Sequence, residues 1–294
     1  MNADRRVALI TCRAWPDLST SDQALSDRLV AHGHEVRTFP WNETDPAEVA
    51  WADLAVFRSN WDYHHELDAF TAWLDALEQL DVEVHNPLPL IRWGLDKRNA
   101  VGIDGIGIRT PQTLVCSDEL VDGGLGPVHD WIDTHEFDRV VVKPAWGASG
   151  HNVQMVAAAD LESVLHRWRA RPERRPLLIQ EFMPGIADGE YALVFFRGEF
   201  SHALIRRPAN DDFRVNSRYG GTMAAATDLD TELLEFGIKV EASLEPRPTY
   251  VRIDVVRDGP GLAVMEVEVN EPALGLNLVH GAAERFAEAL LMAD

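Results

Sequence analysis

The chain has 294 residues, of which 46% are hydrophobic, so it is long enough to bury more than one core. Its 48 acidic and 27 basic residues give a net charge of -21. A surface this acidic repels nucleic acids and anionic membranes, and we expect neither as a partner.

The two cysteines are Cys12 and Cys116, and neither belongs to a CxxC or Cys/His pattern. We therefore expect neither a zinc site nor a disulfide framework. The sequence begins with charged residues that lead directly into an apolar strand, which is not the pattern of a signal peptide. No apolar run approaches the ~20 residues that span a bilayer. These features predict a cytoplasmic protein.

The first part of the chain alternates between strand and helix patterns. The apolar run 6–11 predicts a buried parallel strand, and the apolar spacing over 19–32 predicts a helix that stops at Gly33. Further elements are expected as strands at 34–39, 51–57 and 82–85 and as an amphipathic helix at 66–80. The order β-α-β-β-α-β predicts a small open α/β domain over residues 1–88.

Two further units follow, which we place at residues 89–180 and 181–294. The second unit has expected strands at 110–116, 140–143, 153–156 and 176–181 and helices at 128–135 and 160–170. The third is mostly antiparallel, with expected strand pairs 190–196 with 200–206 and 250–256 with 263–270, the latter around the turn 258–261, and a helix at 282–291. The fold class is therefore mixed α/β.

Lysine is rare in this chain, with three lysines against 24 arginines. Lys143 ends a β-branched strand and precedes a loop of small residues at 145–150, and Lys97 lies in the run Leu-Asp-Lys-Arg-Asn. A lysine at such a strand end can place its ammonium on a phosphate while loop amides cap it. The loop would then be a flap over phosphates. Chance placement of the lysines and an ordinary hairpin turn are the alternatives.

Acidic residues concentrate in the last strand pair. The period of two puts Glu266, Glu268 and Asn270 on one face of one strand, and Arg252 and Asp254 on one face of its neighbour. The short connection makes the strands antiparallel neighbours, so these side chains can converge. Clustered oxygen ligands suit magnesium that also binds substrate phosphates. The alternative is a solvated sheet face.

The residues at the end of the expected strand 176–181 could bind a nucleotide base. Backbone groups from Gln180 to Met183, including Glu181, could meet an adenine edge, and Phe182 could pack on the ring. Glu190 could accept ribose hydroxyls. Each residue alone would more often be core or surface.

These motifs occur in one order: Lys97, Val-Val-Lys143-Pro, Gln-Glu181-Phe-Met-Pro-Gly, Arg252-Ile-Asp254 and Glu268-Val-Asn270-Glu-Pro. In this order they resemble the ATP-grasp superfamily of ligases over nearly the whole chain. The runs 205–216 and 219–221 are similar to its RimK-like and glutathione-synthetase-like branch. The first domain is most similar to the ATP-grasp enzymes of D-cycloserine biosynthesis.

The resemblance implies three domains, with ATP held between the central and C-terminal ones. It assigns phosphate contacts to Lys97, Lys143 and the flap residues Ser149 and Gly150, the adenine hinge to Gln180, Glu181, Phe182 and Met183, and ribose to Glu190. It assigns two magnesium ions, or manganese instead, to Asp254, Glu268 and Asn270. Arg252 would stabilise the transferred phosphoryl group, and Arg206 and Arg214 would hold γ-phosphate or acyl phosphate. Arginine stands at position 206 where some relatives use lysine.

The implied activity is an ATP-dependent carboxylate–amine ligase that forms an amide through an acyl phosphate on a small amino-acid-like substrate. Ring closure within one substrate, as in cycloserine formation, and ligation of two molecules both remain open. A small-molecule kinase with the same magnesium–ATP site is the alternative. We expect a monomer or a homodimer.

Substrate contacts are expected where strands of the first domain end, because open α/β sheets bind ligands there. The candidates are Arg58, Asn60, Asp62 and His64, with Asn277 after the acidic strand. Arg58 could anchor a carboxylate with two hydrogen bonds, or it could form a structural salt bridge. An adjacent pair such as His64 and His65 is more often a pair of surface residues, which is the alternative.

Overall fold

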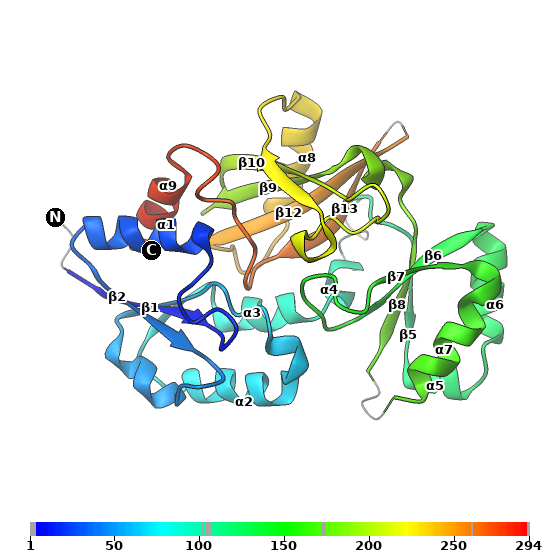
Figure 1. Cartoon of the computed structure of the whole chain (residues 1–294), viewed down its shortest axis with the longest axis horizontal. Helices are drawn as coiled ribbons and strands as arrows, with labels where there is room; N and C mark the ends of the chain where they lie inside the picture. Colours follow the sequence, from blue (N-terminus) through cyan, green and yellow to red (C-terminus); the bar gives the residue numbers. More distant parts are fainter. Residues whose placement is uncertain (1–3, 102, 104–106, 172–174, 260, 293–294) are drawn as a thin grey trace.

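The computed structural model describes residues 4–101, 103, 107–171, 175–259 and 261–292. Their strands form three sheets that occupy successive stretches of the chain (Figure 1). The mixed α/β fold is the one expected from the sequence. Within the described residues, no helix is long and apolar enough to cross a membrane. The domain boundaries at residues 88 and 180 stay a prediction.

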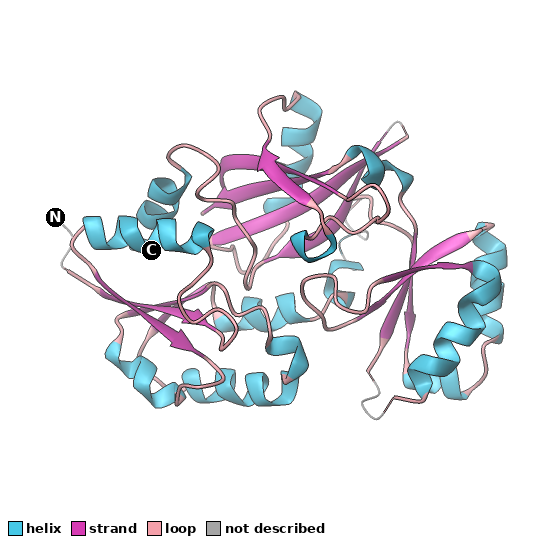
Figure 2. Ribbon diagram, viewed as in Figure 1, coloured by secondary structure: helices cyan, strands magenta, loops and turns pink. Residues whose placement is uncertain are grey.

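The first sheet is parallel, with strand order β2-β1-β3-β4 and helices on both faces (Figure 2). Its elements are β1 (Arg6–Thr11), α1 (Thr20–Ala31), β2 (Glu35–Pro40), β3 (Leu54–Phe57), α2 (Leu67–Leu77) and β4 (Glu83–His85). Alternate residues of β1 enter different cores: Val7 and Leu9 pack with α1 and the last helix, α9 (Ala282–Leu291), and Ala8 and Ile10 pack with α2. The end of the chain therefore returns to its beginning (Figure 1).

The second sheet is antiparallel, with strand order β5-β8-β6-β7. Its elements are β5 (Thr113–Cys116), α5 (Asp118–Asp122), α6 (Gly126–His135), β6 (Arg139–Pro144), β7 (Gln154–Ala157), α7 (Leu161–Arg169) and β8 (Leu177–Glu181). Val140 and Val142 of β6 pack with residues of α6 and α7. Because side chains alternate along a strand, Val141 and Lys143 face the opposite side.

The third sheet is antiparallel, with strand order β11-β10-β9-β12-β13. Its elements are β9 (Glu190–Phe196), β10 (Glu199–Arg207), β11 (Thr222–Ala225), α8 (Thr231–Glu241), β12 (Tyr250–Asp258) and β13 (Gly261–Glu268). Leu233 and Val240 of α8 share a core with Phe195 and Ile253. The alternate residues of β12 therefore point away from this core.

Several elements differ from the expectation. Trp51, expected to begin the third strand, instead ends a 3-10 helix (Pro46–Trp51) that Asp45 caps in a capping box with Glu48, and β3 begins at Leu54. Strand β13 ends at Glu268, so Asn270 lies beyond it. Elements that the sequence patterns did not indicate are α3 (Leu88–Leu95), α4 (Arg98–Val101), α5, β11 and α8. Pro260 of the expected turn lies outside the described residues.

Candidate active site

A cavity of about 1030 Å³ is lined by residues from the first domain and from the second and third sheets. Most of the predicted site residues lie in its wall. They are Asp62, His64, Lys97, Lys143, Ser149, Gly150, Gln180, Glu181, Phe182, Met183, Glu190, Arg206, Arg214, Arg252, Glu268, Asn270 and Asn277. Three predicted residues do not line it, namely Arg58, Asn60 and Asp254.

Two of the three lysines meet at one carboxylate. The Nζ atom of Lys97 lies 2.6 Å from Oε1 of Glu266, and that of Lys143 lies 3.8 Å from the same atom. Burial acts to raise the pKa of Glu266, but the two ammonium groups outweigh it and hold the pKa well below its usual range. Burial lowers the pKa of Lys143 to about 8. Two cations thus flank a single anion at the cavity wall.

Glu266 belongs to a cluster of carboxylates on β12 and β13. Oxygen atoms of Asp254, Glu266 and Glu268 all lie within 4.8 Å of one another. The pairing of β12 with β13 places Arg252 opposite Glu268 and Asp254 opposite Glu266, with a bulge after Asp254. The convergence expected from the period of two is therefore present, and Glu266 is a member that the predicted ligand set left out.

Arg252 binds two of these acids. Its Nε and Nη2 atoms each lie 2.8 Å from an oxygen of Asp254, and Nη2 lies 2.7 Å from Oε1 of Glu268. Burial acts to lower the pKa of this guanidinium, but Asp254 and Glu268 raise it. Arg252 therefore stays charged at the cavity wall.

Arg206 bridges two acids on the same sheet face. Its Nη1 atom lies 2.7 Å from Oδ2 of Asp254 and 2.8 Å from Oε1 of Glu190. The sheet register explains the second contact, since Arg206 is the direct partner of Glu190 across β9 and β10. Burial raises the pKa of Glu190 to about 8 despite this contact. Asp254 is 1% exposed and is bonded to both arginines, so it stands behind the wall.

The side-chain amide of Asn270 has fewer hydrogen-bond partners than the arginines of the cavity wall. Its Oδ1 accepts a 3.5 Å hydrogen bond from Nδ2 of Asn60, and both side chains are buried. The Nδ2 of Asn270 and the Oδ1 of Asn60 have no hydrogen-bond partner. Buried polar atoms of this kind call for a ligand or water. The carboxylate oxygens of Asp254, Glu266 and Glu268, which lie within 4.8 Å of one another, fit the preference of magnesium for oxygen ligands.

The predicted adenine hinge lies where β8 ends. Gln180 is buried and donates to Oγ1 of Thr113, and Oε2 of Glu181 accepts from the backbone nitrogen of Gln112. Met183 is buried with residues of β12 and β13, and Phe182 packs edge-to-face on Phe213. All four hinge residues line the cavity, and two of them, Phe182 and Met183, have apolar side chains.

The predicted flap, residues 145–150, touches a second cavity loop. The hydroxyl of Tyr219 donates to the carbonyl of Gly150 at 3.1 Å, and Gly150 has a φ of +68°. A Cβ at Gly150 would lie 2.8 Å from Oδ1 of Asn216, so the Asn216 side chain would have to shift, and the positive φ itself favours glycine. Arg214 is paired with Asp212 and covers the ring of Tyr219 at 3.4 Å.

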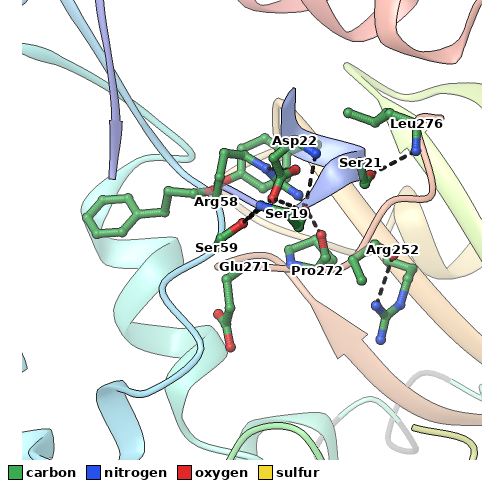
Figure 3. Close-up of polar contacts among 12 residues, drawn as sticks. Ser19, Ser21, Asp22, Arg58, Ser59, Arg252, Glu271, Pro272 and Leu276 are labelled. Carbon is green, nitrogen blue, oxygen red and sulfur yellow. Dashed lines mark hydrogen bonds and ion pairs between the residues drawn. The ribbon is translucent and has the colours of Figure 1, made fainter. Parts of the chain in front are cut away.

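Arg58 is not placed as a substrate anchor. Its side chain is fully buried, Nε donates to Oδ1 of Asp22 at 2.9 Å, and Nη2 donates to the carbonyl of Pro272 at 2.6 Å (Figure 3). Ser19 and Ser59 bind the other oxygen of Asp22. The structural salt bridge that the sequence left open is therefore the arrangement found. The reason is that Asp22, on α1, lies against the end of β3.

The segment 271–276, which follows the acidic strand, is held by side chains from both sides. Its carbonyl groups at 271, 272, 273 and 274 accept from Trp61, Arg58, Arg252 and His202, and the nitrogen of Leu276 donates to Ser21. Figure 3 shows several of these contacts. The first domain therefore fixes one edge of the cavity.

Several cavity residues were not among the predicted site residues. Burial and then Glu268 raise the pKa of Glu271 to about 8. Tyr63 and His151 also line the cavity. They lie there with the predicted residue Asp62, which accepts hydrogen bonds from Trp41 and Asn42. Only Glu266 was indicated, because it shares a strand face with Glu268. Glu271 and His151 come into the site through loops, which no periodicity describes.

Comparisons with known proteins agree with this geometry. Residues 7–86 match the family "D-cycloserine synthetase DcsG, N-terminal domain". The cycloserine biosynthesis protein DcsG of Streptomyces lavendulae is 27% identical over 269 residues, covering 82% of this chain and 84% of that protein. A glutathione synthetase of Prochlorococcus marinus is 28% identical over 281 residues, covering 92% and 84%.

Solved structures share the fold. The crystal structure of D-cycloserine synthetase DcsG matches with a TM-score of 0.85 at 23% identity, covering 97% of this chain and 98% of that one. A RimK domain ATP-grasp protein of Sphaerobacter thermophilus matches with a TM-score of 0.69 at 20% identity, covering 97% and 98%. Residues 109–280, more than half of the chain, match the family "prokaryotic glutathione synthetase, ATP-grasp domain". The chain therefore belongs to this ATP-grasp family, whose members are ligases that use ATP to form carbon–nitrogen bonds.

Proposed function

We propose that this ATP-grasp ligase activates the carboxylate of a small amino-acid-like substrate as an acyl phosphate and then joins it to an amine. The observation that carries the proposal is the convergence of Lys97 and Lys143 on Glu266 beside Asp254, Glu268 and Arg252. Such a wall combines cations for phosphates with oxygen ligands for magnesium.

Magnesium fits the acidic part of this wall. Glu266, Glu268 and Asn270 line the cavity, and Asp254 lies behind them. We infer that these residues hold one or two ions, magnesium or manganese. A bound ion would supply neutralising charge to the phosphates of ATP. With phosphates present, Lys97 and Lys143 would exchange Glu266 for phosphate oxygens.

The first half-reaction needs positive charge where phosphoryl transfer builds negative charge. A carboxylate oxygen of the substrate attacks the γ-phosphorus, the bond to the β,γ-bridging oxygen breaks, and ADP leaves. Arg252 presents its guanidinium to the cavity, fixed by Asp254 and Glu268, and is the group we assign to the transferred phosphoryl oxygens. Arg206 and Arg214 would hold the γ-phosphate or the acyl phosphate.

In the second half-reaction the amine nitrogen attacks the acyl carbon, phosphate leaves, and the nitrogen loses a proton. Water would destroy an acyl phosphate, so the loop 145–150 should cover the cavity during turnover. Its contact with Tyr219 is consistent with such a cover.

The first domain is the source of substrate specificity in this proposal. Asp62, His64 and Asn277 line the cavity, whereas Asn60 acts through Asn270. The match of residues 7–86 to the N-terminal domain of D-cycloserine synthetase supports ring closure within one amino-acid-like substrate. A closed product would be one water lighter than its substrate.

A coupled ADP-release screen over amino acids and O-substituted serines tests the proposal, with product masses measured for each hit. We expect ADP and free phosphate in equal amounts, formed only when an amine is present in the mixture or in the substrate. A stable phosphoester as the product would instead support the kinase alternative and contradict this function.

A further inference from the structure

Three histidines meet at the cavity wall although the proposed reaction uses only one of them. His64 and His65 come from the 3-10 helix Tyr63–His65, and His151 comes from the loop between β6 and β7. Ring centroids lie 3.9 Å apart for His64 and His65, 5.3 Å for His64 and His151, and 5.1 Å for His65 and His151. One nitrogen of each ring lies within 4.8 Å of the other two.

Within the described residues, the imidazole nitrogens of this cluster have few partners. Both ring nitrogens of His64 are buried without a hydrogen bond of normal geometry, although the backbone of Trp61 acts to raise the pKa of this ring. Among the contacts of the described residues, none involves a ring nitrogen of His65 or His151 either. A buried imidazole without a partner is costly, and a protein structure that retains one usually places a water or an ion there.

Two of these imidazoles are held neutral, although Arg218 and Arg171 add positive charge near His151. Burial, and then the other two histidines, lower the pKa of His64 to about 4, and burial also lowers the pKa of His151. These two imidazoles are therefore neutral near pH 7 and offer lone pairs. A neutral imidazole offers a cation its lone pair, whereas it offers a substrate carboxylate only its single N–H group.

We propose that His64, His65 and His151 bind one zinc-like transition-metal ion, separate from the magnesium held by the carboxylates of β12 and β13. Neutral imidazoles suit zinc, cobalt, nickel and copper, whereas magnesium prefers oxygen. Three histidine ligands leave a fourth position open. Since all three residues line the cavity, that position faces the substrate space.

The ion would also join two parts of the molecule. His151 directly follows the loop 145–150, and its backbone nitrogen donates to the carbonyl of Ala148 within that loop. His64 and His65 belong to the first domain. A bound ion therefore ties the cavity loop to the domain that we assign to substrate specificity. This inference does not depend on the proposed ligase chemistry.

Tag-free protein in excess magnesium would be titrated with zinc against a chromophoric chelator, and with cobalt while visible absorption is recorded. Excess magnesium occupies the carboxylates. We expect one equivalent of zinc bound, with a cobalt spectrum of nitrogen ligation. His151→Gln should weaken zinc binding at least about tenfold, as should His64→Gln, because each removes a ligand.

The matched control is His129→Gln with His166→Gln, which removes two exposed histidines near Glu162 and should leave the affinity unchanged. Thermal unfolding with and without zinc gives a second measurement, since an ion bound only by the folded state raises its melting temperature. Absence of stoichiometric binding to the wild type overturns the proposal. Equal binding by a variant that lacks all three histidines overturns it as well.

Discussion

Two buried arginines lie on opposite sides of the segment 271–276, and only one of them faces the cavity. Arg58 pairs with Asp22 and donates to the carbonyl of Pro272, whereas Arg252 pairs with Asp254 and donates to that of Ala273. Both guanidinium groups are almost fully buried. Burial and an acidic partner are therefore common to an arginine enclosed by the fold and to an arginine in the cavity wall. What distinguishes Arg252 is its second acid, Glu268, and its place in the cavity wall.

The largest expected effect is on stability, at Arg58. Arg58→Ala leaves the Asp22 carboxylate buried without its cation, so we expect the free energy of unfolding to fall by about 3–5 kcal/mol. Urea unfolding measures this. Folded variant protein should keep its nucleotide affinity. The double variant Arg58→Met with Asp22→Asn removes both charges and should lose less. A stable Arg58→Ala protein without substrate-stimulated ADP release would restore the substrate-anchor interpretation.

At Arg252 we expect a substitution to lower turnover instead of stability. Arg252→Lys keeps one positive charge near Asp254 and Glu268 but loses the planar fork, so we expect turnover to fall by about 10²–10³-fold with little change in nucleotide affinity. Steady-state kinetics and calorimetry together measure the two quantities. A raised Michaelis constant for ATP with unchanged turnover would show that Arg252 binds the ground state.

A substitution at Lys143 tests whether the same cavity wall binds ATP before the reaction. Lys143→Ala removes a charged contact to phosphate, worth about 1.5–3 kcal/mol, and should weaken ATP binding about 10–100-fold. The matched control is Lys239→Ala, because Lys239 is exposed on α8 and, among the described residues, donates only to the carbonyl of Gly107. Unchanged ATP affinity in Lys143→Ala would remove the phosphate role from this lysine.

The smallest expected effect is a change of stability with pH, caused by His202, which contacts the segment 271–276. Nε2 of His202 donates to the carbonyl of Leu274 and Nδ1 accepts from Ser201, so the ring is neutral. Burial lowers its pKa from 6.5 to about 4. Between these values the unfolded chain binds a proton that the folded chain does not. The stabilisation is therefore complete above about pH 6.5 and is lost as the pH falls toward 4, by about 1–3 kcal/mol.

His64 contributes in the same pH window, so the comparison must be made between variants. Unfolding free energies of wild type and His202→Gln, measured from pH 7 to 4, should converge as the pH falls. Parallel curves would mean that His202 does not titrate in this way.

The acidic face of the site was predictable because a period of two and a short connection fix which side chains of β12 and β13 share a face. The position of Lys143 in the cavity wall was predictable because it lies at the end of a strand. Arg58 was not, because its partner Asp22 lies 36 residues earlier and only the fold brings them together. The helix α8 contains Gly237, which weakens the helical signal but lets the helix approach Leu193, where a Cβ would lie at 2.5 Å. Pro89 and Gly94 obscure α3 in the same way.

Magnesium-dependent nucleotide binding tests the central claim most directly. Calorimetry would compare ATP binding in magnesium and in EDTA, for the wild type and for Glu266→Gln with Glu268→Gln. We predict tight binding by the wild type only with magnesium, and a double variant that gains little from the ion. Equal and negligible ATP binding by the wild type in both buffers would contradict the assignment of the β12–β13 wall as a magnesium–ATP site.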